Sequence, residues 1–271
     1  MSKNKRQTLA YRMQPAIPAG LFFWLKSWSQ LRRLRKKLIR GKEVRRHTTV
    51  SRDIYENYGP WEQEMYLHGQ EYTTCDGKIR LVPFTRIRAG YLAPVKTEIE
   101  RQLAAAPGQR LRVLEVGAGN CINLMLLNEA FGDKIELVGI DISPKRLEVS
   151  RETWGAKLDG VDLHVDSATE LATCADRSFD VVFSMHCLEQ VPYDAGSAVR
   201  AISRVCRGRI VFVEPVFEFG NTAQKIYAIT GDQLRTLLPE IAKAGLRVVE
   251  SYPLDILAHP LNKTGVVVVE V

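Results

Sequence analysis

The chain has 271 residues, of which 45% are hydrophobic and 25% are charged, an ordinary composition for one globular α/β domain with extensions. Its apolar runs are shorter than the roughly 20 residues of a membrane-spanning helix, and the run from Leu21 to Leu25 is too short for a signal-peptide core. Five widely spaced cysteines form no C-x-x-C pair, which indicates neither a disulfide framework nor a zinc site. We therefore expect a cytoplasmic protein without a bound metal.

The charge is unevenly distributed along the chain. The net charge is +7, but residues 1–46 contain fourteen lysines and arginines and a single acid, Glu43, so this segment carries +13. Residues 47–271 therefore sum to 7 − 13 = −6. We interpret residues 1–46 as a basic N-terminal extension attached to a mildly acidic body.

Within this extension, residues 21–46 have the pattern of a basic amphipathic helix. Apolar residues recur there at spacings of three and four, namely Leu21, Trp24, Trp28, Leu31, Leu34 and Leu38. Basic residues fill most other positions, namely Arg32, Arg33, Arg35, Lys36, Lys37 and Arg40. Three interpretations are open: peripheral docking on an anionic membrane or a lipid-linked substrate, packing on the body or a partner, and contact with nucleic acid.

Residues 47–105 mix aromatic and polar side chains without a clean period and become helix-like from about Pro94 to Ala105. The aromatic and histidine residues of this segment include Tyr55, Tyr58, Trp61, Tyr66, His68 and Tyr72. Its position just before the first core strand suggests a cap or lid over a substrate. A packed N-terminal extension explains the same pattern equally well.

Residues 106–271 alternate strands with helices, which predicts a parallel sheet covered on both faces. Strands are expected at 111–116, 135–140, 161–165, 179–184, 210–214, 246–252 and 265–271. Helices are expected at 121–131, 144–153, 195–205 and 231–244. The connection at 253–264 shows no helical pattern, so the last two strands can pair only as an antiparallel hairpin. The fold class is therefore α/β, with a seven-stranded, mostly parallel sheet and an N-terminal helical extension.

A glycine turn follows the first of these strands. The segment Val113-Leu114-Glu115-Val116-Gly117-Ala118-Gly119-Asn120-Cys121 leaves the strand and opens a helix, so its backbone N–H groups can approach a ligand closely. Glu115 is placed to hold an amino group of that ligand. Asp141, at the end of the next strand, can accept both hydroxyls of a ribose.

At this point the sequence resembles the class I SAM-dependent methyltransferases, where SAM is S-adenosylmethionine, and in particular their small-molecule branch. The resemblance spans about residues 88–271 and includes the antiparallel end of the sheet. The motifs occur in family order: Glu115-Val116-Gly117-Ala118-Gly119-Asn120, Asp141, Asp166-Ser167-Ala168, Phe179-Asp180-Val181-Val182-Phe183-Ser184, and Phe212-Val213-Glu214-Pro215. The sequence departs from the pattern at Cys121, where the family commonly has a third glycine.

The resemblance implies SAM as cofactor and assigns a role to each motif. Glu115, Gly117, Ala118, Gly119 and Asn120 would surround the methionine part, Asp141 and Ile142 the ribose and adenine, and Asp166, Ser167 and Ala168 the adenine edge. Ser184 and Met185 would lie beside the sulfonium. Taken singly, Glu115 could be a surface acid, Asp141 a helix N-cap and Asp166 a turn residue.

The resemblance places His186 and Glu189 next to the reacting atoms. Methyl transfer is an in-line displacement, so alignment lowers much of the barrier, and a base is needed only when the acceptor must lose a proton. His186 and Glu189 are the acid/base candidates, and a pocket-wall role for His186 is the alternative. The long segment 216–229 is expected to be an acceptor-facing loop.

The sequence thus predicts transfer of a methyl group to an oxygen, nitrogen or carbon atom of a small or lipid- or carrier-linked acceptor. Alternatives are a non-catalytic SAM-binding or membrane-associated scaffold protein, and an RNA-directed methyltransferase. An NAD(P)-dependent oxidoreductase would want glycine where the chain has Ile122. Amino-directed nucleic-acid enzymes carry an Asn-Pro-Pro-Tyr type motif, where this chain has Ser184-Met185-His186-Cys187.

Overall fold

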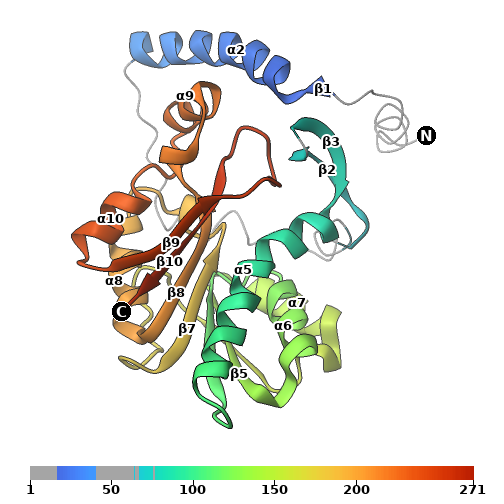
Figure 1. Ribbon diagram of the computed structural model, residues 1–271, viewed down its shortest axis with the longest axis vertical. Helices are drawn as coiled ribbons and strands as arrows, with labels where there is room; N and C mark the ends of the chain where they lie inside the picture. Colours follow the sequence, from blue (N-terminus) through green and yellow to red (C-terminus); the bar gives the residue numbers. More distant parts are fainter. Residues whose placement is uncertain (1–16, 41–63, 65–66, 76) are drawn as a thin grey trace.

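The computed structural model describes residues 17–40, 64, 67–75 and 77–271 of the chain. These residues form a seven-stranded sheet covered by helices and a separate three-stranded sheet, with one helix, α2, lying across the top of the body (Figure 1). The expected aromatic residues Tyr55, Tyr58, Trp61 and Tyr66 lie outside the described residues, as does the part of the predicted basic helix beyond residue 40.

The large sheet has the strand order β6-β5-β4-β7-β8-β10-β9. Its strands are β4 (Leu111–Val116), β5 (Ile135–Asp141), β6 (Val161–Val165), β7 (Phe179–Met185), β8 (Cys206–Pro215), β9 (Arg247–Pro253) and β10 (Thr264–Glu270). The pairs among β4 to β8 are parallel, whereas β10 runs antiparallel to both β8 and β9. The predicted fold class, including the antiparallel C-terminal hairpin, is confirmed.

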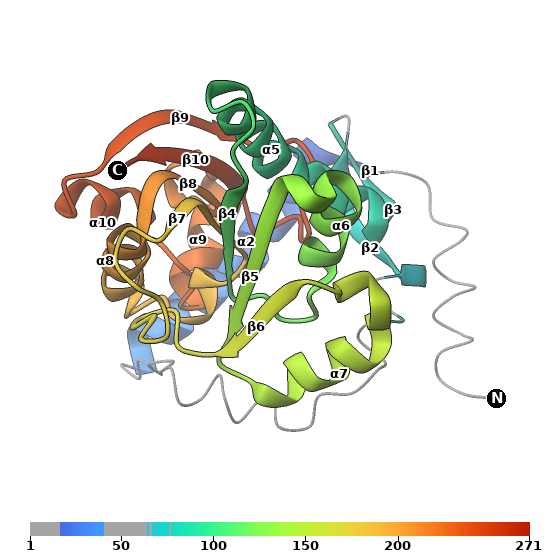
Figure 2. The ribbon, with the colours of Figure 1, turned by 90° about the horizontal axis from the view of Figure 1, so that it is seen from below.

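Helices cover both faces of this sheet (Figure 2). One core contains residues of α5 (Phe84–Ala105), α6 (Ile122–Phe131) and α7 (Pro144–Trp154), and the other contains residues of α8 (Ala195–Val205) and α10 (Leu237–Lys243). Strands β4, β7, β8 and β10 therefore have side chains buried on both faces, as their near-continuous apolar runs require. Short 3₁₀ turns lie at Gly132–Lys134, Gly155–Leu158, Leu188–Gln190 and Phe217–Phe219.

The small sheet is an antiparallel arrangement of β1 (Ile17–Pro18), β3 (Lys78–Pro83) and β2 (Gln70–Cys75), in that order. The sequence analysis missed the β2–β3 hairpin because its polar and apolar residues alternate only weakly. The Asp76-Gly77 pair was the available signal, since Gly77 has φ +67° and such pairs favour tight hairpin turns.

Two helix predictions need correction. The helix expected from Pro94 begins ten residues earlier, because α5 starts at Phe84 and continues through Pro94. The segment expected as an acceptor-facing loop, 216–229, contains α9 (Thr222–Thr230), while only 237–243 of the helix expected at 231–244 is helical. Asn221 starts α9 with a capping box: its side chain accepts from the Gln224 N–H, and the Gln224 side chain accepts from the Asn221 N–H.

Helix α2 (Ala19–Arg40) packs on α9 and follows β1 directly. In Figure 1, α2 lies above α9, and the loop between β9 and β10 rises toward it. Among the described residues, no helix is long and apolar enough to cross a membrane.

Candidate functional site

The glycine turn at the end of β4 packs tightly against its surroundings. Gly117 has φ +79°, and a Cβ placed on it would lie 2.4 Å from Cys187 Sγ. The N–H groups of Gly117 and Ala118 both donate to the Ile140 carbonyl of the neighbouring strand, at 2.9 and 2.7 Å. Only glycine meets both the backbone angle and the lack of space at position 117.

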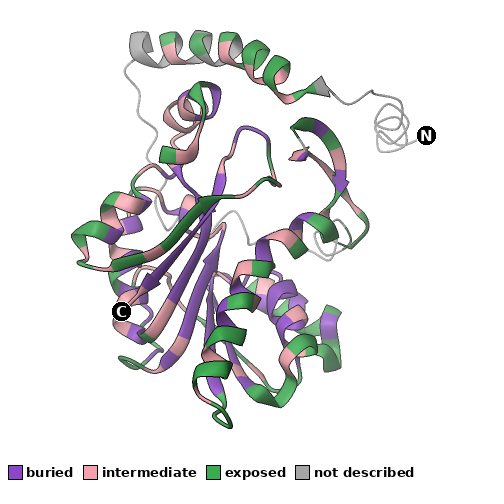
Figure 3. Cartoon of the chain, viewed as in Figure 1, coloured by how far each residue is buried: buried purple, intermediate pink, exposed green. Residues whose placement is uncertain are grey.

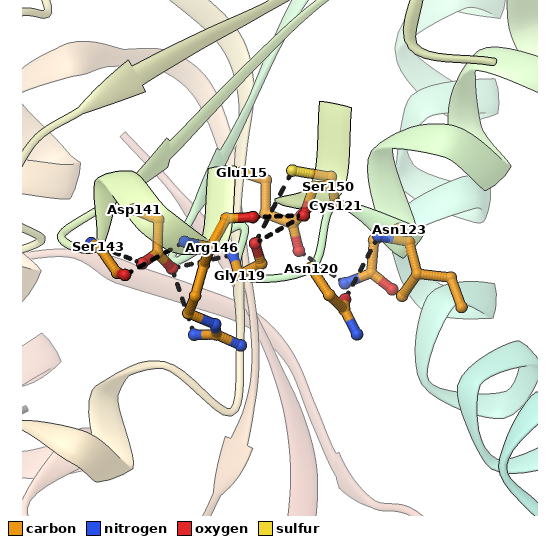
Figure 4. A network of polar contacts seen from close by, with 10 residues as sticks. Glu115, Gly119, Asn120, Cys121, Asn123, Asp141, Ser143, Arg146 and Ser150 are labelled. Atoms are coloured by element: carbon orange, nitrogen blue, oxygen red, sulfur yellow. Dashed lines mark hydrogen bonds and ion pairs between the residues drawn. The ribbon is translucent and has the colours of Figure 1, made fainter. Parts of the chain in front are cut away.

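Asp141 ends β5 and holds the second half of this turn. Its carboxylate accepts from the N–H groups of Gly119 and Ser143, both at 2.9 Å, and lies 3.5 Å from the Arg146 guanidinium (Figure 4). Arg146 extends from α7 over Gly119, where a Cβ on the glycine would lie 2.5 Å from one guanidinium nitrogen. Asp141 is thus both an anchor of the turn and a charged group at its rim.

Glu115 lies beneath the turn and is buried. Asn123 of α6 donates to its Oε1 at 2.6 Å, while Oε2 is buried without a hydrogen-bond partner (Figure 4). Burial raises the pKa of Glu115 to about 8, although the Asn123 hydrogen bond and the nearby Arg88 charge act in the opposite direction. A buried carboxyl group with one oxygen that lacks a hydrogen-bond partner can bind a cationic group of a ligand.

Asp166, directly after β6, has its carboxylate held by the following loop. Oδ1 accepts from the Ser167 N–H at 2.7 Å, and Oδ2 accepts from the N–H and hydroxyl of Thr173. Partial burial acts to raise the pKa of Asp166, but these hydrogen bonds outweigh it and the pKa is lowered. The carboxylate is therefore ionised and fixed in position.

These groups meet in one cavity of about 300 Å³ at the carboxyl ends of the parallel strands. The predicted site residues that line it are Glu115, Gly117, Ala118, Gly119, Asn120, Asp141, Ile142, Asp166, Ser167, Ala168, Met185, His186 and Glu189. Ser184 does not line the cavity. It is buried and donates from Oγ to Glu214 Oε1 at 2.9 Å, so its contact is with the sheet interior.

His186 also lines the cavity and has an unusual backbone conformation, with φ +53°. A hydrogen bond of 2.9 Å joins its Nδ1 to Glu189 Oε1, and another of 2.9 Å joins its Nε2 to the Thr264 hydroxyl. Burial opposes the charged form, but the Glu189 charge and hydrogen bond outweigh it and raise the pKa of His186. Asn262 in turn donates to Glu189 Oε2 at 2.6 Å.

Tyr91 of α5 completes this network. Its ring stacks on the imidazole of His186 with ring centroids 5.2 Å apart, and its hydroxyl is 3.1 Å from the Thr264 hydroxyl and accepts from the Ala258 N–H. Burial raises the pKa of Tyr91 to about 12, so the phenol is neutral at physiological pH. The loop between β9 and β10, residues 254–263, thereby forms the roof over this end of the cavity.

Several cavity-lining residues were missed by the sequence analysis, among them Arg88, Tyr91, Asn123 and Arg146. Arg88 donates to Asn123 Oδ1 at 3.3 Å, so a cation of α5 lies close to the Glu115 carboxyl group. These residues belong to helices, and their direction depends on how each helix packs on the sheet. Within the described part of the chain, no three histidines, cysteines or carboxylates cluster as a metal site would require.

Residues 113–208 match the protein family described as "Methyltransferase domain". This part of the chain is therefore similar to methyltransferase domains. A ubiquinone biosynthesis O-methyltransferase from Hahella chejuensis is 34% identical over 140 residues, which are 51% of this chain and 55% of that protein. An uncharacterized methyltransferase from Schizosaccharomyces pombe is 26% identical over 52% of each chain. The chain thus spans about half the length of the curated relatives it matches.

Solved structures share the fold at low sequence identity. Magnesium protoporphyrin IX methyltransferase from Synechocystis, with bound S-adenosylhomocysteine, superposes with a TM-score of 0.55 at 16% identity, covering 82% of this chain and 98% of that one. The [4+2]-cyclase SpnF superposes with a TM-score of 0.61 at 14% identity, covering 84% and 97%. At these identities the likeness concerns the fold.

The residues of this cavity fit SAM, the cofactor that the sequence resemblance implies. The partnerless Oε2 of Glu115 matches the amino group of its methionine part, and the tight turn at Gly117 leaves backbone close to the ligand. Carboxylates at Asp141 and Asp166 lie further along the same cavity, where ribose hydroxyls and an adenine amino group need acceptors.

Proposed function

We propose that this chain transfers a methyl group from SAM to an oxygen, nitrogen or carbon atom of a small or lipid- or carrier-linked acceptor. The observation that carries the proposal is one cavity that is lined by the glycine turn, Glu115 and Asp141 together with His186 and Glu189. Bound SAM supplies an electrophilic methyl carbon whose departure leaves a neutral thioether.

The proposed cofactor end is built from charged groups of known placement. Glu115 binds the amino group with Oε2, while Asn123 keeps Oε1 in place. Arg88, beside Asn123, is the cation nearest to where the carboxylate of the methionine part would lie. Asp141 would accept hydrogen bonds from the ribose hydroxyls. One of these would replace its contact with the Arg146 guanidinium, which is 3.5 Å away.

At the acceptor end, His186 is the proposed general base and Glu189 its positioning residue. Because Glu189 holds Nδ1, the proton resides there in the neutral ring and Nε2 is the basic nitrogen. Nε2 contacts Thr264, so an acceptor hydroxyl takes the place of the Thr264 hydroxyl when it binds. His186 then receives the acceptor proton as the oxygen–methyl bond forms.

Oxygen is the acceptor atom favoured by the curated relatives, whose names describe O-methyltransferases of ubiquinone biosynthesis. A hydroxyl is also the acceptor that gains most from a base. The basic charge of residues 21–46 supports an anionic membrane surface as a partner, which suits a lipid-linked acceptor.

The test is turnover of SAM with a panel of phenols, carboxylic acids and amines, comparing the wild type with His186→Asn. We expect one acceptor class to be methylated, with kcat reduced about 100-fold or more in the variant. A variant whose turnover equals that of the wild type at every pH would remove His186 as a base.

A second function rests on the fold alone. The likeness to the cyclase SpnF shows that this architecture is found in proteins whose names do not describe methyl transfer. A non-catalytic or non-methylating SAM-binding protein would bind SAM yet leave every acceptor of the panel unmethylated. Adding RNA oligonucleotides to the panel separates the RNA-directed alternative, because only that enzyme would label them.

A further inference from the structure

Helix α2 has two apolar faces, and the described part of the chain covers only one of them. Phe22, Phe23 and Leu34 are half-buried in this helix, which packs on α9. On another side, five large apolar residues at spacings of three and four are exposed: Leu21, Trp24, Leu25, Trp28 and Leu31. Trp24 and Trp28 are each 60% exposed and contact each other edge to face. Figure 3 shows exposed residues along much of α2. We call these five residues the outer stripe.

Exposed tryptophans in this number are costly in water unless a partner covers them. The charge of the same helix indicates which partner. Its 22 residues include seven lysines and arginines and no acid: Lys26, Arg32, Arg33, Arg35, Lys36, Lys37 and Arg40. Tryptophan and leucine suit the boundary between lipid head groups and acyl chains, and a dense positive charge suits anionic head groups. Phosphates of a nucleic acid would satisfy the charge but would leave the outer stripe in water.

The position of α2 connects this stripe with the cavity. Lys26, on α2, is close enough to His259 in the roof loop for its charge, together with burial of the imidazole, to lower the pKa of His259. Tyr227 of α9 stacks on the same imidazole at 5.6 Å between ring centroids, and Gln224 donates to the Pro260 carbonyl at 2.8 Å. The roof loop therefore lies beside α2 and α9 on its outer side. On its inner side it contacts the His186–Glu189 pair.

We propose that the outer stripe of α2 inserts into the head-group region of an anionic bilayer, so that the roof loop of the cavity faces the membrane. Trp24 and Trp28 enter the interface, and the net positive charge of the helix sequence attracts the anionic head groups. The docking itself does not depend on the proposed function. The consequence that the acceptor comes from the bilayer does rest on it.

The experiment uses the full chain and lipid vesicles of two compositions, phosphatidylcholine alone and phosphatidylcholine with phosphatidylglycerol. Co-sedimentation gives the partition coefficient for the wild type and for Trp24→Ser/Trp28→Ser. The matched control is Val248→Ser/Tyr252→Ser, which removes exposed apolar side chains from the edge strand β9. We expect binding only to the anionic vesicles, weakened about tenfold or more in the tryptophan variant and unchanged in the control.

Two further readouts check the mode of binding. Added salt should weaken vesicle binding, because lipid charge is screened. Brominated lipids should quench Trp24 and Trp28 but not Trp154, which is 7% exposed; the measurement uses a Trp61→Phe background. Both variants should keep the melting temperature and SAM affinity of the wild type, since the substituted side chains lie outside the cavity.

The proposal is overturned if the wild type ignores anionic vesicles, or if the tryptophan variant binds them as well as the control does. It is also overturned if the tryptophan substitutions instead convert a dimer to a monomer, or if RNA oligonucleotides are bound through the same two residues and vesicles are not. A chain that binds SAM but no vesicles contradicts the docking alone. A chain that binds vesicles but no SAM contradicts the proposed function and leaves the docking intact.

Discussion

Replacing Glu115 with glutamine should stabilise the chain without ligand and weaken its binding of SAM. Glutamine keeps the size of the side chain and an oxygen that accepts from Asn123, whose Nδ2 is 2.6 Å from Glu115 Oε1. It removes the ability to ionise at a fully buried position. The substitution therefore isolates the cost of a buried charge from changes in packing.

The size of the effect follows from the raised pKa. The pKa of Glu115 is about 8 in the folded chain against an ordinary 4.5, because burial disfavours the carboxylate. Between these two pH values the unfolded chain loses its proton while the folded chain keeps it, so the wild type loses stability as pH rises from 4.5 to about 8. The full difference corresponds to on the order of 5 kcal/mol, reached above pH 8 or so.

The assay is urea unfolding of the wild type and Glu115→Gln at a series of pH values, followed by calorimetric titration with SAM. The two proteins should have nearly equal stability at pH near 4.5, and the variant should gain progressively up to about pH 8 and no further. SAM should bind the variant about 30-fold or more weakly, because a neutral amide replaces the partner of the amino group. A stability difference that does not change with pH, or undiminished SAM affinity, would refute the reasoning.

Three further predictions concern neighbouring positions. Gly117→Ala should reduce SAM affinity about 100-fold, because the φ of +79° and the 2.4 Å from a Cβ to Cys187 Sγ both oppose a side chain. Gly160→Ala is the control in the calorimetric titration, because Gly160 has a similar φ of +76° and nothing within 4 Å of its Cβ position. This control should leave SAM affinity unchanged. Glu189→Gln should move the rising limb of the pH–rate profile to lower pH, because the Glu189 charge raises the pKa of His186 and only the neutral imidazole accepts a proton. An unchanged profile would show that His186 is not the titrating base. Glu214→Gln should also become more stable than the wild type as pH rises from 4.5. The difference in unfolding free energy should level off near pH 7, because burial raises the pKa of Glu214 to about 7. Urea unfolding should distinguish this pH dependence from that of Glu115→Gln.

The parallel core could be predicted from sequence because its strands are buried on both faces. Such strands appear as short apolar runs, as at Leu111–Val116, and their boundaries agreed with the structure to within a few residues. The β2–β3 hairpin could not be recognised in this way, because neither strand contains a long apolar run and most of their residues are polar or only partly buried. Helix α9 was hidden by its position between two expected elements, although its capping residues Asn221 and Gln224 are readable in the sequence.

The site residues at strand ends could be predicted from the sequence, whereas those on helices could not. Residues at strand ends, such as Glu115, Asp141 and Asp166, were predicted because the sheet fixes where each strand ends. Arg88, Asn123 and Arg146 were not predicted, since a helix residue faces the cavity only for one rotation of the helix about its axis. The network at His186 depends on Thr264, 78 residues further along the chain, and no local pattern reports such a contact.

The exposure of the outer stripe of α2 could not be predicted from the sequence either. The spacing of Leu21, Trp24 and Trp28 predicts a helix with an apolar face but not whether that face is covered by the body. In the structure, α2 packs on α9 through other residues and leaves the two tryptophans exposed. The helix therefore packs on the body, as one of the three interpretations expected, while the outer stripe stays exposed.

The most direct test of the central claim is calorimetric titration of the chain with SAM, S-adenosylhomocysteine and NAD, repeated on Asp141→Asn. Asparagine keeps one oxygen for the N–H groups of Gly119 or Ser143 but loses the second acceptor. We predict saturable binding of both adenosyl compounds, at least about tenfold weaker in the variant, and no binding of NAD. A folded chain that binds neither adenosyl compound would contradict the account.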